Sequence, residues 1–139
     1  MRKYNGKEYI ESDKHDIGEL IEIVHILRSP DGCEWDRAQD FESLKKCLKD
    51  ETEEVLAAVD NKDYKNLQEE LGDVLLQVVM NSEIAKEQGL FDINDVVQTL
   101  CEKLIRRHPH VFGDVAKPTT PEESLKIWKM VKEIEKNRK

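Results

Sequence analysis

The sequence has 139 residues, the length of one domain with a single core. Charged residues make up 37% of the chain and apolar residues 38%, with few aromatics, which favours amphipathic helices over a sheet buried on both faces. The net charge of −8 argues against a nucleic-acid-binding protein, because such proteins usually carry a dominant basic face.

The composition also predicts where the protein works. No apolar run approaches the length of a membrane span, and the segment MRKYNGKEYI lacks the apolar stretch of a secretory signal. The three cysteines have no paired spacing, which is typical of a reducing compartment. We therefore expect a cytoplasmic protein that has no membrane or nucleic-acid partner.

The N-terminal part of the chain predicts one helix and one loop. Residues 1–12 have no regular apolar spacing and are expected to form a tail. Apolar residues then recur at helical spacing over residues 13–28, with Ser12 as the cap. The following segment SPDGCEWDRAQDF is rich in turn residues and predicts a loop. Its Trp35 is expected either to plug the edge of a core or to contact a ligand.

The middle of the chain predicts two helices joined by a tight turn. The first runs over residues 43–59 and the second over residues 64–88, with the turn DNKD at residues 60–63. The second helix is apolar nearly all round in its middle, in the run VLLQVVM. A helix of this kind is buried on several sides, and a chain of this size has little surface with which to cover it. The sequence therefore predicts a homodimer or a higher homo-oligomer.

The C-terminal part predicts two more helices. One begins after its cap Asp92 and ends before Pro109. The other begins at Thr120, Pro121 and Glu123, which are a cap, a proline at the first helical position and a capping-box partner. No strand is required anywhere, so the fold class is all-α. We expect a bundle of about five helices in a single domain over residues 13–137.

Four acidic residues of the predicted helix pair lie at matching levels. In an antiparallel pair, the numbers of facing residues have a constant sum, here about 124, given the turn centre near residue 62. Glu54 therefore faces Glu70, and Glu51 faces Asp73. The apolar spacing turns most of these side chains toward the seam between the helices. An ordinary solvated surface remains the alternative for each acid taken singly.

Carboxylates crowded in a seam repel each other and lose hydration, so they need a cation or a raised pKa. Four oxygen-bearing side chains suit a hard divalent cation, Mg²⁺ or Mn²⁺. No histidines at ligand spacing accompany them, which disfavours zinc. Di-iron bundles use Glu-x-x-His pairs, whereas the second acidic motif here reads Glu-x-x-Asp. The predicted metal ligands are Glu51, Glu54, Glu70 and Asp73.

A basic cluster, EKLIRRHPH, stands out in this acidic chain. It places Lys103, Arg106 and Arg107 within about one and a half helical turns. Basic residues at the C-terminus of a helix often only complement the helix dipole. Beside an acidic metal site, however, they suggest a polyphosphate substrate whose oxygens the arginines bind in bidentate fashion. No glycine-rich phosphate loop is present in the sequence.

These motifs together resemble the MazG family of nucleoside triphosphate pyrophosphohydrolases, over roughly residues 17–135. The loop GCEWD, the acidic motifs DETEE and ELGD, and the segment KLIRRHPHVF follow the family pattern in order. A tryptophan and a lysine near the C-terminus, Trp128 and Lys132, extend the match. The chain departs from the pattern at Asp50, where the family has glutamate, and at Glu34 and Asp40 in the loop.

The resemblance implies Mg²⁺-dependent hydrolysis of an NTP or dNTP to the monophosphate and pyrophosphate. It implies metal binding by the two acidic motifs, with Asp50 as a candidate to activate water, and phosphate binding by the basic cluster. Trp35 and Trp128 are candidates to contact the base or ribose.

Three kinds of alternative remain. One is a related all-α pyrophosphatase, such as a dUTPase, a dCTPase or phosphoribosyl-ATP pyrophosphatase. Another is a nonenzymatic helical module whose acidic face binds a basic partner. The third is a carboxylate-bridged redox metal protein.

Overall fold

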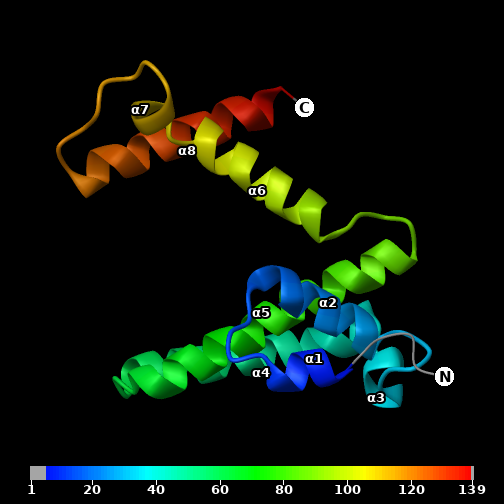
Figure 1. Ribbon diagram of the computed structural model, residues 1–139. Helices are drawn as coiled ribbons and strands as arrows, with labels where there is room; N and C mark the ends of the chain where they lie inside the picture. Colours follow the sequence, from blue (N-terminus) through cyan, green and yellow to red (C-terminus); the bar gives the residue numbers. More distant parts are fainter. Residues whose placement is uncertain (1–5, 139) are drawn as a thin grey trace. The chain divides into compact units, whose positions relative to one another are not determined.

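The computed structural model describes residues 6–138 and confirms the all-α class (Figure 1). No strand occurs in this range. Five helices in it have more than ten residues, as expected: α2 (Ile17–Leu27), α4 (Phe41–Asp60), α5 (Tyr64–Glu87), α6 (Ile93–Arg106) and α8 (Pro121–Asn137). None of the helices in the described range is both long and apolar enough to cross a membrane.

Three short helices were not expected from the sequence: α1 (Gly6–Glu11), α3 (Glu34–Arg37) and α7 (Pro109–Phe112). The helix α1 lies in the predicted tail, of which residues 1–5 are outside the described range. Each of the three has at most six residues, which is too few for apolar periodicity to reveal.

The cap of α2 is also a correction. Asp16, not Ser12, caps this helix: its side chain accepts a hydrogen bond from the Glu19 backbone N–H at 2.8 Å. The Ser12 hydroxyl instead donates to the Lys14 carbonyl at 2.7 Å. The cap of α8 was predicted correctly, because the Thr120 side chain accepts from the Glu123 backbone N–H and Pro121 occupies the first turn.

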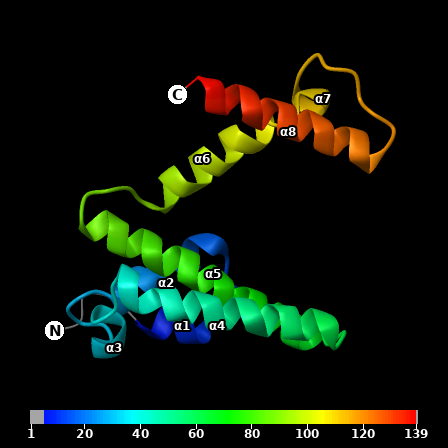
Figure 2. The same ribbon diagram turned by 180° about the vertical axis from the view of Figure 1, so that it is seen from behind.

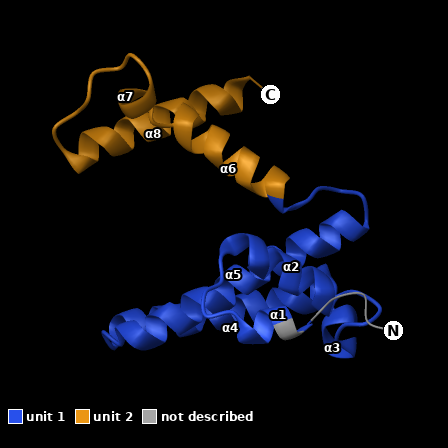
Figure 3. Ribbon diagram, viewed as in Figure 1, with its two compact units in different colours: residues 1–93 blue, residues 94–139 orange. Residues whose placement is uncertain are grey.

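The chain divides into two compact units, residues 1–93 and 94–139 (Figure 3). In the first unit, α4 and α5 form an antiparallel hairpin against which α2 packs (Figure 2). One apolar core joins these three helices, with partly buried side chains around it; its buried members are Val24, Leu44, Val79, Met80 and Ile84. The predicted single domain of residues 13–137 stays a prediction.

The loop between α2 and α4 is anchored by Arg28, whose side chain is 7% exposed. Its guanidinium donates to the carbonyls of Asp36 and Gln39 and to the carboxylate of Glu87 on α5. Gly32 has no room for a side chain, because a Cβ there would lie 2.2 Å from two carbonyl oxygens of α2. The loop therefore has a fixed connection to the core of its unit.

One face of the α4–α5 hairpin remains apolar and exposed. Leu71, Leu75 and Val78 recur at helical spacing on α5 and are 51%, 36% and 39% exposed, and Leu56 on α4 is 58% exposed. The described core buries the other side of α5, at Val79 and its neighbours. The predicted burial of this helix on several sides is thus not achieved within the first unit.

The three cysteines, Cys33, Cys47 and Cys101, are free thiols. The expected reducing, cytoplasmic location stays a prediction.

Candidate metal centre and anion-binding groove

The turn between α4 and α5 sets the levels of the acidic residues. The first helix ends at Asp60, one residue later than predicted, and the second begins at Tyr64, as predicted. Lys62 adopts a left-handed backbone conformation with φ of 53°, and Asp63 caps α5 by accepting from the Asn66 backbone N–H. This short connection holds the two helices antiparallel and in a fixed register.

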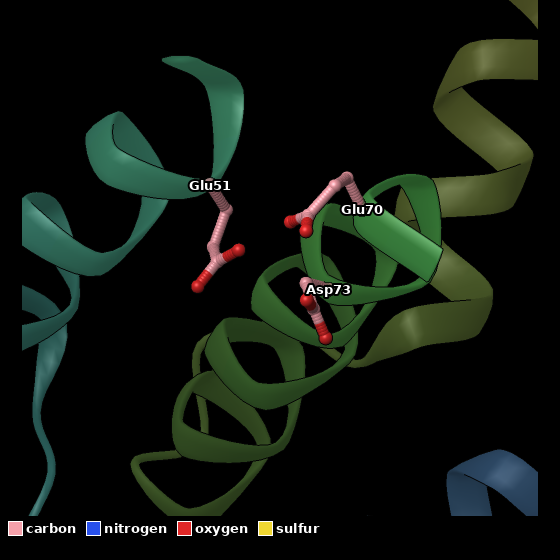
Figure 4. Close-up of side chains that lie close together, drawn as sticks. All are labelled: Glu51, Glu70 and Asp73. Carbon is pink, nitrogen blue, oxygen red and sulfur yellow. The ribbon is translucent and has the colours of Figure 1, made fainter. Parts of the chain in front are cut away.

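Three of the four predicted carboxylates converge across the hairpin. Glu51 from α4 points toward Glu70 and Asp73 from α5 (Figure 4). One carboxylate oxygen from each lies within 4.8 Å of the others, and all three residues are half-buried. The seam between the helices therefore contains a cluster of negative charge, which we call the acidic cluster.

Two other predicted acids are not part of this cluster. Glu54 is exposed and contributes no oxygen to it, although its charge is close enough to affect Glu70. Asp50 is also exposed. The level of each residue follows from the register, but neither Glu54 nor Asp50 has an oxygen within 4.8 Å of all three clustered acids. Their roles as ligand and water-activating group stay predictions.

The crowding of carboxylates in the acidic cluster shifts the pKa of Glu70. Loss of hydration raises the pKa of Glu70 above its usual value of 4.5, and the charges of Asp73, Glu54 and Glu51 raise it further. No ion pair with a lysine or arginine is recorded for the three clustered acids among residues 6–138. The cluster therefore has the chemistry of a cation site: several hard oxygen donors without a compensating charge.

The second unit contains a basic groove of about 820 Å³ between the end of α6 and α8. Six cationic residues, two carboxylates and one indole line it: Lys103, Arg106, Arg107, Lys129, Lys132, Lys136, Glu133, Glu135 and Trp128. The three basic residues predicted from the sequence all line this groove. Such a concentration of lysines and arginines can bind an anion with several charges.

Trp128 is a half-buried part of this groove. The Arg107 guanidinium carbon lies 5.3 Å from the centre of its ring, and the Lys132 ammonium lies 4.9 Å from it. Trp128 therefore orients two cations. The other predicted tryptophan, Trp35, lies on α3 in the first unit and is 62% exposed.

Sequence reasoning missed Glu135, which forms ion pairs with Arg106 and Arg107. The residue lies on α8 (Pro121–Asn137), and its partners lie 28 and 29 residues earlier in the chain. No local motif links it to them.

The acidic cluster predicts a measurable response to metal. Ionisation of Glu70 opposes folding, since its pKa is raised in the folded state; this cost is present in full above that pKa and fades as the pH falls toward 4.5. Glu70→Gln should therefore melt at a higher temperature than the wild type at pH 8 in a chelator, and the difference should narrow toward pH 4.5. Mg²⁺ should raise the melting temperature of the wild type but not that of Glu70→Gln.

Glu53→Gln is the matched control, because Glu53 is an exposed acid of α4 outside the acidic cluster. It should melt like the wild type and keep the response to Mg²⁺. If Glu70→Gln responded to Mg²⁺ as the wild type does, the acidic cluster would not be the metal site.

A family model described as the MazG nucleotide pyrophosphohydrolase domain matches residues 39–112, which is more than half of the chain. The matched range includes the acidic cluster and the basic residues of α6.

Curated relatives agree with this match. The chain is 54% identical over 121 residues to "Nucleoside triphosphate pyrophosphohydrolase/pyrophosphatase MazG" of Thermotoga maritima, covering 87% of this chain and 46% of that protein. It is 41% identical over 124 residues to the "Nucleoside triphosphate pyrophosphohydrolase" of Escherichia coli K12, covering 88% and 47%. The chain thus spans about half the length of these relatives.

A solved structure also resembles this fold. The crystal structure of a mazG-related protein from Thermotoga maritima matches with a TM-score of 0.69 at 33% identity, covering 84% of this chain and 99% of that one. The family model, the curated relatives and this structure agree, and the chain belongs to the MazG family.

Proposed function

We propose that this chain hydrolyses nucleoside triphosphates, NTP or dNTP, to the monophosphate and pyrophosphate, with Mg²⁺ as the cofactor. The observation that carries the proposal is the convergence of Glu51, Glu70 and Asp73 in a chain that belongs to the MazG family. Relatives from Thermotoga maritima and Escherichia coli are named as nucleoside triphosphate pyrophosphohydrolases, which supports the reaction class.

The residues present fit a hard divalent cation. The three clustered carboxylates supply oxygen donors, and Glu54 is one helical turn from Glu51. One turn after Asp73 on α5, the buried Gln77 carries a side-chain oxygen that has no hydrogen-bond partner among the described residues. Mg²⁺ is the favoured ion and Mn²⁺ the substitute, because both prefer oxygen ligands.

Each group has a proposed part in the reaction. The carboxylates of Glu51, Glu54, Glu70 and Asp73 hold the metal, which would neutralise phosphate charge and lower the pKa of water. A carboxylate that does not bind metal, with Asp50 as the candidate, accepts the proton of the attacking water.

In this proposal, the basic groove of the second unit binds the phosphates of the substrate. Lys103, Arg106 and Arg107 bind phosphate oxygens, the two arginines with planar donor forks that match the geometry of an oxyanion. Trp128 holds Arg107 in place and offers an aromatic face to the nucleoside. Trp35 is a second candidate for that contact, because its indole is largely exposed.

Product analysis tests the reaction. The full chain is incubated with each NTP and dNTP in Mg²⁺, and the products are separated by chromatography. Monophosphate and pyrophosphate are the expected products, with no turnover when a chelator replaces the metal. Diphosphate with phosphate, or no turnover of any nucleotide, would contradict the proposal. Turnover of a single pyrimidine dNTP would favour the dUTPase or dCTPase alternative.

We also propose that the chain forms a homodimer or a higher homo-oligomer through the exposed apolar face of α5. The mass in solution at micromolar concentration should be at least about twice the 16.2 kDa of one chain, as measured by light scattering. Val78→Lys should reduce it to the monomer value, because a charge in a buried apolar interface is costly. Ile10→Lys changes an exposed residue of α1 and serves as the control. A monomeric wild type would refute this assembly.

A further inference from the structure

A single carboxylate, that of Glu135, forms ion pairs with both arginines of the groove. Glu135 Oε2 accepts from Arg107 Nε at 3.2 Å and from Arg107 Nη2 at 3.0 Å. Its other oxygen, Oε1, accepts from Arg106 Nε. The Glu135 side chain is 20% exposed and that of Arg107 15% exposed, so the contact with Arg107 is largely shielded from water. Glu135 thus takes the position on Arg107 that a bidentate oxyanion would take.

Glu135 stays charged throughout the range in which proteins function. Its hydrogen bonds with Arg106 and Arg107 lower its pKa to about 2. The ring of Trp128 holds Arg107 from another side. The guanidinium is therefore oriented, and partly neutralised, before any ligand binds.

The other carboxylate of the groove behaves differently. Glu133 lines the same groove on the same helix, but no ion pair is recorded for it among residues 6–138. The four lysines of the groove likewise have no recorded carboxylate partner in that range. Glu135 is therefore the carboxylate of the groove that pairs with the arginines. The four lysines remain available to bind an anion from solution.

We propose that Glu135 is a resident counter-anion that an incoming phosphate must displace from Arg107 and Arg106. This inference rests on the proposed function, in which the groove binds the phosphates of the substrate. A tethered carboxylate has a high effective concentration at the arginines, so it outcompetes singly charged anions from solution. A polyphosphate replaces it, since it brings more charge and also reaches the lysines. Glu135 thereby excludes anions of low charge from the arginines. It makes the groove specific for polyphosphates.

Calorimetric titration of the full chain with inorganic pyrophosphate, without metal and at constant ionic strength, tests this role. Glu135→Gln removes the competing charge but keeps an acceptor, so it should bind pyrophosphate about tenfold more tightly than the wild type. Glu133→Gln makes the same change of charge in the same groove and should gain less than about twofold. If Glu135→Gln melts early by circular dichroism, Glu135→Ala is used, with the same expectation.

Two outcomes would overturn the inference. One is weaker or unchanged binding by the Glu135 variants, which would mean that the carboxylate only braces the arginines. The other is the absence of detectable pyrophosphate binding in both the wild type and Glu135→Gln. Arg107→Ala separates this from a failure of the proposed function. If Arg107→Ala binds pyrophosphate as the wild type does, the groove is not the phosphate site, and that assignment fails whatever the Glu135 variants do.

Discussion

Replacing Asp73 by asparagine should lower kcat for nucleoside triphosphate hydrolysis by about a thousandfold, because a metal ion contributes several kcal/mol of transition-state stabilisation. The amide keeps the size of the side chain and one oxygen, but it removes the negative charge that a cation requires. One carboxylate oxygen of Asp73 lies within 4.8 Å of an oxygen of Glu51 and of Glu70. Loss of the Asp73 charge therefore affects the whole cluster. Activity is measured as pyrophosphate release in saturating Mg²⁺.

The same substitution should leave the fold intact. Removing one of several crowded like charges relieves repulsion in the metal-free protein, so helical content and melting temperature should not fall. Glu53→Gln, which removes an exposed charge from α4, should retain nearly all activity. Full activity in Asp73→Asn would show that the acidic cluster does not hold the catalytic metal. A loss of helical content would instead indicate a structural role for Asp73.

The long helices could be predicted because each has an apolar stripe of several turns. The hairpin of α4 and α5 followed from the turn at residues 60–63, and the levels of the acids followed from the hairpin. Residue numbers specify the level of a side chain but not its rotamer. Glu51 and Asp73 therefore met as expected, whereas Glu54 lies at the right level and is exposed outside the cluster.

Competition between local groups limited the prediction elsewhere. Ser12 and Asp16 are both good caps, and the structure selects Asp16, whose carboxylate accepts from the Glu19 backbone N–H. The short helices α3 and α7 are each a single turn whose conformation depends on the surrounding loop. Sequence pattern carries little information at this length.

The pairing of Glu135 with Arg106 and Arg107 could not be predicted from the sequence for another reason. It joins two helices through side-chain geometry that depends on how α6 and α8 pack. The basic residues stood out because they are contiguous in an acidic chain. Their carboxylate partner resembled any other acid on the polar face of a helix.

Arg107 should contribute to substrate binding through its geometry as well as its charge. Arg107→Lys keeps the positive charge but loses the planar fork that donates two hydrogen bonds to one oxyanion. It also loses the guanidinium that lies 5.3 Å from the centre of the Trp128 ring. We expect kcat/KM to fall by about a hundredfold, which corresponds to the loss of two charge-assisted hydrogen bonds. Most of this loss should appear as a higher KM.

Arg138→Lys is the matched control, because Arg138 is an exposed arginine that does not line the groove. It should have wild-type kinetics. A purely electrostatic groove would tolerate Arg107→Lys, since the net charge is unchanged, and KM would then stay near the wild-type value. A fall in kcat with unchanged KM would instead mean that Arg107 acts in the transition state only. The division of the loss between kcat and KM therefore decides whether the arginine fork recognises the polyphosphate before chemistry begins.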